Sequence, residues 1–352
     1  MELCIHDRGS GSRAAPSAED PYTKSYCDLG VHQSMLRDRE RCQWYRNAIE
    51  QVLKERPGMV VLDVGTGTGL LAMFAARAGA RKVYAVESSR MASLAQMNVF
   101  DNGMSDIVDV LHSRIEDVKL PEKVDLIVSE WMGHYLLHES MIDSVIFARD
   151  NFLKEEGTML PSSARILLAP VSAERVWRDK VEFWSDPEET WGLTLHAVHP
   201  VAVEQMVSSP MIVRVDETDV IELPQVLWEC DMYKITPAEV RKIAKSMTFA
   251  VNQTMRGACI WFEVSEDSSN SVLDTSPSKP ETHWKQTLGK CVDVMDALIN
   301  NDGAVMFPEE VLPSFLPSGK VSCVTEMSRV HGTRQYNLMI DLKPVPEERK
   351  DS

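Results

Sequence analysis

The chain of 352 residues has no pair of cysteines with C-x-x-C spacing, and its seven cysteines are scattered along the sequence. This spacing argues against a structural zinc site and a disulfide framework, and it predicts reduced thiols in the nucleus or the cytoplasm. No apolar run approaches the roughly 18 residues that a membrane-spanning helix needs. Residues 1–21 contain no secretory hydrophobic segment and are predicted to be a disordered lead-in.

Positive charge is also scarce, since 37 Lys and Arg residues face 53 Asp and Glu residues, for a formal net charge of -16. Such a surface repels nucleic acid and anionic lipid, so we expect neither direct nucleic-acid binding nor membrane association. It attracts basic protein partners, although acidity can also serve solubility alone, and both interpretations stay open here. The length and the 44% hydrophobic content allow one large domain or two ordinary ones.

The pattern of apolar residues changes near Leu160-Pro161. Before this point, short apolar runs predict strands at 60–65, 82–87, 108–113 and 124–130. Helix-like stretches separate these runs, and helical spacing is also expected over 22–48 and 139–152, with Gly157 as a stop. Alternating strands and helices predict a parallel sheet covered on both faces.

The second half of the chain consists mainly of short β-like runs, which predict a sandwich or a barrel. Within it, RVWRDKVEFWSDPEETWGL (175–193) has a helical pattern and carries Trp177, Phe183, Trp184 and Trp191. So many large apolar groups on an inserted segment indicate either a partner surface or packing on their own domain.

Three glycines mark the end of the first predicted strand. VLDVGTGTG (61–69) places Gly65, Gly67 and Gly69 directly before a helix, so the backbone can approach a ligand closely. Glu87 ends the second strand, where an acid accepts the ribose hydroxyls of a nucleoside. The segment therefore predicts a nucleoside site.

The dinucleotide pattern G-x-G-x-x-G is incomplete, because Leu70 stands where its last glycine belongs. A G-x-x-x-x-G-K-[ST] phosphate loop is lacking as well, and Asp63 beside the loop would repel a pyrophosphate. S-adenosylmethionine has a ribose and no phosphate, so it fits best. A dehydrogenase site and an ordinary glycine turn remain as alternatives.

Two glutamates stand nine positions apart in SEWMGHYLLHESM (129–141), among apolar and aromatic residues. On one helix Glu130 and Glu139 would be separated by about 900° and would face opposite sides. They converge only if residues 131–138 double back, which Gly133 permits. Converged carboxylates need a shared cation or proton. A guanidinium suits their geometry, while a metal held with His134 and His138, or two solvent-facing acids, are the other interpretations.

These segments together resemble the protein arginine N-methyltransferase family. The resemblance is carried by VLDVGTGTGLLAMFAARAGARKVYAVE (61–87) and SEWMGHYLLHESM, by SYCDLGVHQSMLRDRER (25–41), similar to the family's cofactor-covering helix, and by THWKQT (282–287), similar to its THW loop. It extends from about Tyr22 to Leu342.

The resemblance implies a Rossmann-like class I methyltransferase domain over 22–160, followed by a β-barrel substrate domain over 161–352 with a helical dimerisation arm at about 173–195. It also implies S-adenosyl-L-methionine as cofactor, S-adenosyl-L-homocysteine as product, and a homodimer. The expected substrates are basic proteins, such as histone tails or Arg/Gly-rich proteins. Met35 and the intact THW loop resemble type I members, which form monomethyl- and asymmetric dimethylarginine.

The site residues implied by the resemblance fall into two groups. Glu130 and Glu139 would grip the substrate guanidinium, and Glu139 or the pair of His283 and Asp38 would accept its proton. Cofactor contacts are implied for Tyr26, His32, Met35, Arg41, Asp63, Gly65, Gly67, Glu87, Ser88, Glu116 and Met141. No metal is expected.

Three positions depart from the family pattern, namely Thr23 in place of an aromatic residue, His134 in place of a tyrosine, and Asp274 in place of a serine. A catalytically silent module that binds basic tails therefore remains an alternative, and a small-molecule methyltransferase is a third.

Overall fold

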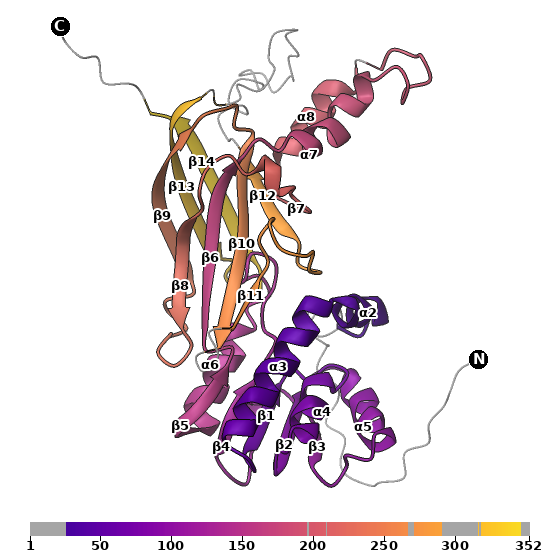
Figure 1. Ribbon diagram of the computed structural model, residues 1–352, viewed down its shortest axis with the longest axis vertical. Coiled ribbons are helices and arrows are strands. Elements are labelled where there is room, and N and C mark those ends of the chain that lie inside the picture. The colour runs from indigo at the N-terminus through magenta and orange to yellow at the C-terminus, as the bar shows by residue number, and fades with distance from the viewer. Residues whose placement is uncertain are drawn as a thin grey trace, which may run out of the picture.

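The computed structural model describes residues 26–195, 197–208, 210–266, 271–290, 316 and 318–345. The predicted lead-in, Tyr22 and Thr23 lie outside these residues. A parallel sheet with its helices forms one part of the molecule and antiparallel sheets form the other (Figure 1). The expected fold class, a Rossmann-like domain joined to a mostly β domain, is confirmed.

The parallel sheet has five strands in the order β3-β2-β1-β4-β5. Its strands are β1 (Val60–Val64), β2 (Lys82–Glu87), β3 (Val108–His112), β4 (Val124–Val128) and β5 (Leu153–Leu160). The first four were expected from their apolar runs, and β1 is buried at every position. The strand order reverses between β1 and β4, so the carboxyl ends of these two strands border a crevice in which ligands bind.

Helices precede and separate these strands. They are α2 (Leu29–Arg37), α3 (Arg39–Glu55), α4 (Leu70–Arg77), α5 (Met91–Asp101), the 3₁₀ turn Ile115–Asp117 and α6 (Ile142–Phe152). The helical stretch expected over 22–48 is interrupted at Asp38, whose carboxylate accepts a hydrogen bond from Arg41 N at 3.0 Å and thereby caps α3.

The helix expected over 139–152 begins only at Ile142, because Glu139 and Ser140 have φ angles of +78° and +53°. Its end at Phe152 is confirmed, but the residue that stops it is not Gly157, since β5 begins directly at Leu153. The strand β5 was not expected, because its first half is largely exposed and lacks an apolar run.

The antiparallel part contains two ladders, ordered β7-β12-β10-β6-β8 with β11 beside β10, and β14-β13-β9. The strands are β6 (Ser163–Val171), β7 (Met211–Val213), β8 (Gln225–Asp231), β9 (Lys242–Val251), β10 (Gly257–Glu266), β11 (Ser271–Asp274), β12 (Gln286–Lys290), β13 (Gly319–Arg329) and β14 (Tyr336–Pro344). The ladders approach each other where β8 passes β9 and β12 passes β14. This arrangement is barrel-like, although among the described residues no continuous backbone ladder closes the ring.

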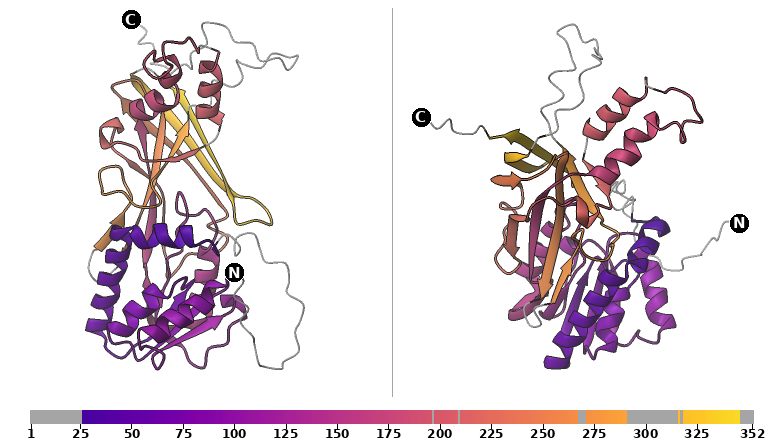
Figure 2. Two further views of the ribbon diagram at one scale, coloured as in Figure 1. Left: turned by 90° about the vertical axis from the view of Figure 1, so that its right-hand side faces the viewer. Right: turned by 45° about the horizontal axis from the view of Figure 1, so that its top comes forward.

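A helical segment is inserted between β6 and β7 and projects away from the parallel sheet (Figures 1 and 2). It comprises α7 (Glu174–Lys180), a 3₁₀ turn (Glu182–Ser185) and α8 (His199–Ser208); a further 3₁₀ turn, Glu217–Asp219, follows β7. Trp177 is buried against its own domain, whereas Trp191 is 91% exposed. In the described part of the chain, no helix has the length and apolar content to span a membrane.

Candidate functional site

The glycine loop after β1 is shaped by close packing. Gly65 and Gly67 have φ angles of +78° and +55°, which side chains other than glycine rarely adopt. A Cβ atom on Gly65 would overlap the Met141 side chain, and one on Gly67 would lie 3.3 Å from His32 Cε1. The loop therefore leaves its backbone open toward the crevice.

Asp63 supports this loop from below and does not line the cavity. Its Oδ2 accepts hydrogen bonds from Thr66 Oγ1 at 2.6 Å and from Ala72 N at 3.0 Å, which fixes the loop to the start of α4. Burial raises the pKa of Asp63 to about 7, because Oδ1 is buried without a hydrogen-bond partner. The structure thus places this predicted cofactor contact behind the loop.

Glu87, at the carboxyl end of β2, presents its carboxylate to the cavity. Its two oxygens accept hydrogen bonds from Gly67 N at 2.9 Å and Ser89 N at 2.8 Å. These bonds fix the carboxylate while each oxygen keeps a lone pair for a ribose hydroxyl. Ser88 lines the cavity next to it.

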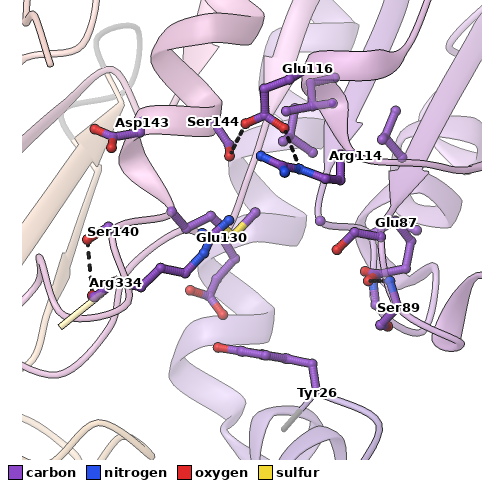
Figure 3. Close-up of a pocket in the computed structure, with 18 of the residues that line it drawn as sticks. Tyr26, Glu87, Ser89, Arg114, Glu116, Glu130, Ser140, Asp143, Ser144 and Arg334 are labelled. Atoms are coloured by element: carbon purple, nitrogen blue, oxygen red, sulfur yellow. Dashed lines mark hydrogen bonds and ion pairs between the residues drawn. The ribbon is translucent and has the colours of Figure 1, made fainter. Parts of the chain in front are cut away.

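Glu116 lies in the 3₁₀ turn after β3 and also lines the cavity (Figure 3). Its Oε1 accepts a hydrogen bond from Ser144 Oγ at 2.7 Å, and its Oε2 is paired with Arg114 Nε at 3.3 Å. Burial favours the neutral carboxyl, but these donors outweigh burial and lower its pKa.

The cavity bordered by these groups has a volume of about 810 Å³. It offers two fixed carboxylates, those of Glu87 and Glu116, and an open glycine backbone. These features fit a nucleoside with an amino-acid tail, so the residues present are suited to S-adenosylmethionine. His32 is held beside the glycines, where its Nε2 donates to Tyr26 O at 2.8 Å.

The segment between the two glutamates doubles back as a tight turn. Gly133 N donates to Leu136 O at 2.9 Å and Leu136 N donates to Gly133 O at 3.0 Å. A Cβ atom on Gly133 would overlap the carbonyl oxygen of His138, so glycine is required there. The return loop that convergence of Glu130 and Glu139 demands is therefore present.

Glu130 is paired with a guanidinium of its own chain. Its Oε2 contacts Arg41 Nη2 at 3.0 Å and Nε at 3.1 Å, and both side chains are more than nine-tenths buried. Burial alone would lower the pKa of Arg41, but the charge of Glu130 outweighs burial and raises it. The Oε1 atom accepts a hydrogen bond from Met132 N at 3.2 Å and retains a lone pair.

Glu139 is bound by Tyr26, whose hydroxyl donates to Oε2 at 2.5 Å. Burial raises the pKa of Glu139, and the nearby charge of Glu130 adds to this effect. Glu139 is not among the residues that line the cavity, whereas Tyr26, which donates to it, does line the cavity.

The THW loop (282–287) is fixed to the junction of α2 and α3 and to the segment 130–140, which is called the glutamate turn below. Asp38 Oδ2 accepts from His283 N at 2.8 Å and from His283 Nδ1 at 2.7 Å. Burial alone would raise the pKa of Asp38, but these bonds and that from Arg41 N lower it. Trp284 Nε1 donates to Met132 O at 2.8 Å. Asp38 and His283 lie outside the cavity lining, so their contacts are those of a support.

The structure brings most of the predicted residues to one cavity. Those that line it are Tyr26, His32, Met35, Arg41, Gly65, Gly67, Glu87, Ser88, Glu116, Glu130 and Met141. Asp38, Asp63, Glu139 and His283 stand behind this lining. The β domain contributes a wall of the cavity that was not predicted from the sequence, and this wall includes Arg241, Arg329 and Arg334. No local motif marks these arginines.

Two of the departures from the family pattern, His134 and Asp274, lie within the described residues, and neither lines the cavity. His134 is partly buried and its Nδ1 has no hydrogen-bond partner. His138 Nδ1 contacts the Tyr135 hydroxyl at 2.8 Å. The two imidazole rings are 6.4 Å apart, and the search of the described residues found no cluster of three potential metal ligands. Asp274 accepts from Ser276 N at 2.8 Å within its own turn.

Comparisons with known proteins agree with these features. A family model described as the arginine methyltransferase oligomerization subdomain matches residues 162–298, and one described as ribosomal protein L11 methyltransferase matches residues 45–163. Protein arginine N-methyltransferase 6 of Danio rerio is 40% identical over 303 residues, covering 84% of this chain and 86% of the relative. Probable protein arginine N-methyltransferase 6.2 of Oryza sativa subsp. indica is 39% identical over 300 residues, covering 76% of this chain and 75% of the relative.

Solved structures give the same result. The crystal structure of protein arginine methyltransferase 6 aligns with a TM-score of 0.73 and 28% identity, covering 90% of this chain and 100% of that chain. The Trypanosoma brucei protein arginine methyltransferase 1 enzyme-prozyme heterotetrameric complex with AdoHcy aligns with a TM-score of 0.74 and 27% identity, covering 92% of this chain and 95% of that chain.

Proposed function

The chain belongs to the protein arginine N-methyltransferase family, and we propose that Glu130 and Glu139 together bind the guanidinium of its substrate. It is a type I enzyme that uses S-adenosylmethionine and leaves S-adenosylhomocysteine. The observation that carries the proposal is the return turn at 133–136, which brings a second, half-buried carboxylate back toward the end of β4.

The chain's own carboxylates address the main chemical obstacle, which is that a protonated guanidinium has no free lone pair. When bound, S-adenosylmethionine supplies a methyl group on a positively charged sulfur. Carboxylates that bind two guanidinium nitrogens draw positive charge toward them, so lone-pair character gathers on the third nitrogen. Glu130 Oε1 and the second oxygen of Glu139 are the acceptors that we assign to this binding.

We assign acceptance of the leaving proton to Glu139. Its raised pKa makes it a better proton acceptor than an ordinary carboxylate. The Asp38–His283 pair stands outside the cavity lining, and its two contacts join the backbone N–H and the Nδ1 of His283 to the same Asp38 Oδ2. We therefore assign this pair the positioning of the THW loop.

We also propose that the inserted helical segment forms a homodimer. The match to an oligomerization subdomain supports assembly of this part of the chain. Trp191 and Leu193, at the tip of the segment, are 91% and 67% exposed. On α5, Leu94, Met97 and Phe100 are 43%, 59% and 73% exposed at a spacing that aligns them on one face. The exposed tip of one copy would pack against this apolar face of α5 in the second copy.

Basic proteins are the proposed substrates, because the chain carries a net charge of -16 and its acceptor groups are carboxylates. Histone tails and Arg/Gly-rich proteins both have this chemistry. Within the described residues, Cys42, Cys230, Cys259 and Cys323 form no disulfide, which supports the proposal that the protein resides in the nucleus or the cytoplasm.

The test is incubation with labelled S-adenosylmethionine and either a histone or an Arg/Gly-rich peptide, followed by amino-acid analysis. Asymmetric dimethylarginine is the expected product. Symmetric dimethylarginine would contradict the assignment to type I. If the cofactor binds and no methylarginine forms on either substrate, a silent module for basic tails is the better description.

A further inference from the structure

The glutamate turn is strained and needs support from outside. Tyr135, Leu136, Glu139 and Ser140 have φ angles of 42°, 72°, 78° and 53°, in the left-handed region. Side chains other than glycine are disfavoured there, and such residues persist only when surrounding contacts hold them. The position of the Glu139 carboxylate therefore depends on whatever fixes this turn.

The connection between β13 and β14 supplies contacts of this kind. Ser140 Oγ donates to Arg334 O at 3.0 Å (Figure 3). Arg334 Nη1 in turn donates to Glu139 O at 3.4 Å. The Tyr135 hydroxyl donates to Tyr336 O at 3.1 Å. Three of the four strained residues are thus bonded to residues 334 and 336, about 200 positions away in the sequence.

The first half of the same connection is bonded to the helix that follows the turn. Arg329 Nη1 forms an ion pair with Asp143 Oδ2 in the first turn of α6, and Arg329 Nε donates to Thr333 O at 3.1 Å. Arg329, Arg334 and the residues between them line the cavity. The segment 329–336 therefore holds both ends of the Glu139–Asp143 stretch.

We propose that Arg334 is a positioning residue for methyl transfer, which holds the strained glutamate turn so that the Glu139 carboxylate faces the substrate. The inference rests on the proposed binding role of Glu139 and adds to it a requirement for the β domain. Arg334 then acts through the backbone of Glu139, while its charge acts on the carboxylate.

Four charged or titratable groups face Glu139 from separate elements. They are Tyr26 before α2, Glu130 after β4, His283 before β12 and Arg334 before β14. Arg334 and the Tyr26 hydroxyl favour the ionised carboxylate, whereas Glu130 opposes it. Loss of the arginine charge therefore shifts ionisation of Glu139 to higher pH, and a lysine at this position reverses that shift.

The experiment compares Arg334→Met and Arg334→Lys with the wild type. The matched control is Arg165→Met, which removes an arginine on β6 that pairs with Glu263 at 2.5 Å, outside the cavity lining. Four quantities are measured: kcat and KM over a range of pH, the Kd of S-adenosylhomocysteine, and amide hydrogen exchange of a peptide covering residues 133–141 in the absence of substrate.

For Arg334→Met we expect kcat to fall roughly 10- to 100-fold, since displacement of a reacting group by about 1 Å has effects of this size. In Arg334→Met the acid limb of the kcat profile against pH should move to higher pH, and in Arg334→Lys it should lie at the wild-type position. Exchange of 133–141 should accelerate, whereas the cofactor Kd and all properties of Arg165→Met should stay at the wild-type values.

Unchanged exchange of 133–141 in Arg334→Met would overturn the proposal, even if the wild-type protein showed no transfer to the chosen substrates. Faster exchange with unchanged kcat would also overturn it, because the turn would then move without consequence. A weakened cofactor Kd with an unmoved pH profile would assign Arg334 to cofactor binding instead.

Discussion

Replacement of Glu139 by glutamine tests the guanidinium site most directly. The variant keeps the shape of the side chain and an oxygen for the Tyr26 hydroxyl, which donates at 2.5 Å in the wild type. It removes one negative charge from the proposed substrate contact and removes the proposed proton acceptor. The fold should tolerate the change, because this charge is buried and is repelled by Glu130.

The size of the effect follows from the two lost roles. A hydrogen bond to a charged group contributes about 1.5–3 kcal/mol, which corresponds to roughly 10- to 150-fold. Loss of a positioned proton acceptor costs about 10²- to 10⁴-fold. Since the two effects overlap, we expect Glu139→Gln to lower kcat by at least about 100-fold.

The assay is single-turnover transfer of a labelled methyl group, with cofactor Kd and Tm measured in parallel. The cofactor Kd should stay at its wild-type value, and Tm should not fall. The control is Glu263→Gln on β10, because burial raises the pKa of Glu263 as it does that of Glu139, while its contacts are with Arg165, away from the cavity. Near-normal transfer by Glu139→Gln would refute the two-carboxylate mechanism.

Two further predictions concern assembly and pH. Trp191→Ala should weaken the dimer at least about tenfold in sedimentation analysis, because exposed tryptophans are frequent interface anchors. The control Trp177→Ala should instead lower Tm, because it leaves a cavity in the core. A dimer affinity in Trp191→Ala equal to that of the wild type would exclude the tip as the contact. The folded state raises the pKa of Asp63 from 3.8 to about 7, so it binds more protons than the unfolded chain between these values, and the free energy of unfolding falls as pH rises through this range. Asp63→Asn keeps an oxygen for Thr66, and in urea titrations from pH 4 to 7 it should lose part of this decline; an identical slope would contradict the raised pKa.

The sequence was sufficient to predict features that depend on neighbouring residues. The runs at 60–65 and 82–87 become β1 and β2 because they are apolar at nearly every position, as strands buried on both faces must be. Once the strands are parallel, their carboxyl ends lie on one edge, so Gly65, Glu87 and Glu130 were expected together. The need for a return loop followed from helix geometry alone.

Details that depend on remote contacts could not be predicted in this way. Residues 139–141 continue the apolar spacing of α6, yet the left-handed conformation at Glu139 and Ser140 delays the helix to Ile142. Asp63 occupies the position of a ligand contact in the linear pattern, but its carboxylate points to Thr66 and Ala72 beneath the loop. Which way a side chain faces at a strand end is decided by packing that no short motif reports.

The wall supplied by the β domain shows why such contacts matter for the chemistry. A parallel sheet alone could bind the nucleoside, because Glu87, Glu116 and the glycine loop all come from it. The carboxylates proposed to bind the substrate depend on both domains. The turn that carries Glu139 is bonded to the segment 329–336, and Met132 in the same turn is bonded to Trp284. Cofactor binding should therefore depend mainly on the parallel-sheet domain, while the geometry of methyl acceptance depends on the antiparallel domain as well. Substitutions in the β domain are thus expected to change kcat more than cofactor affinity.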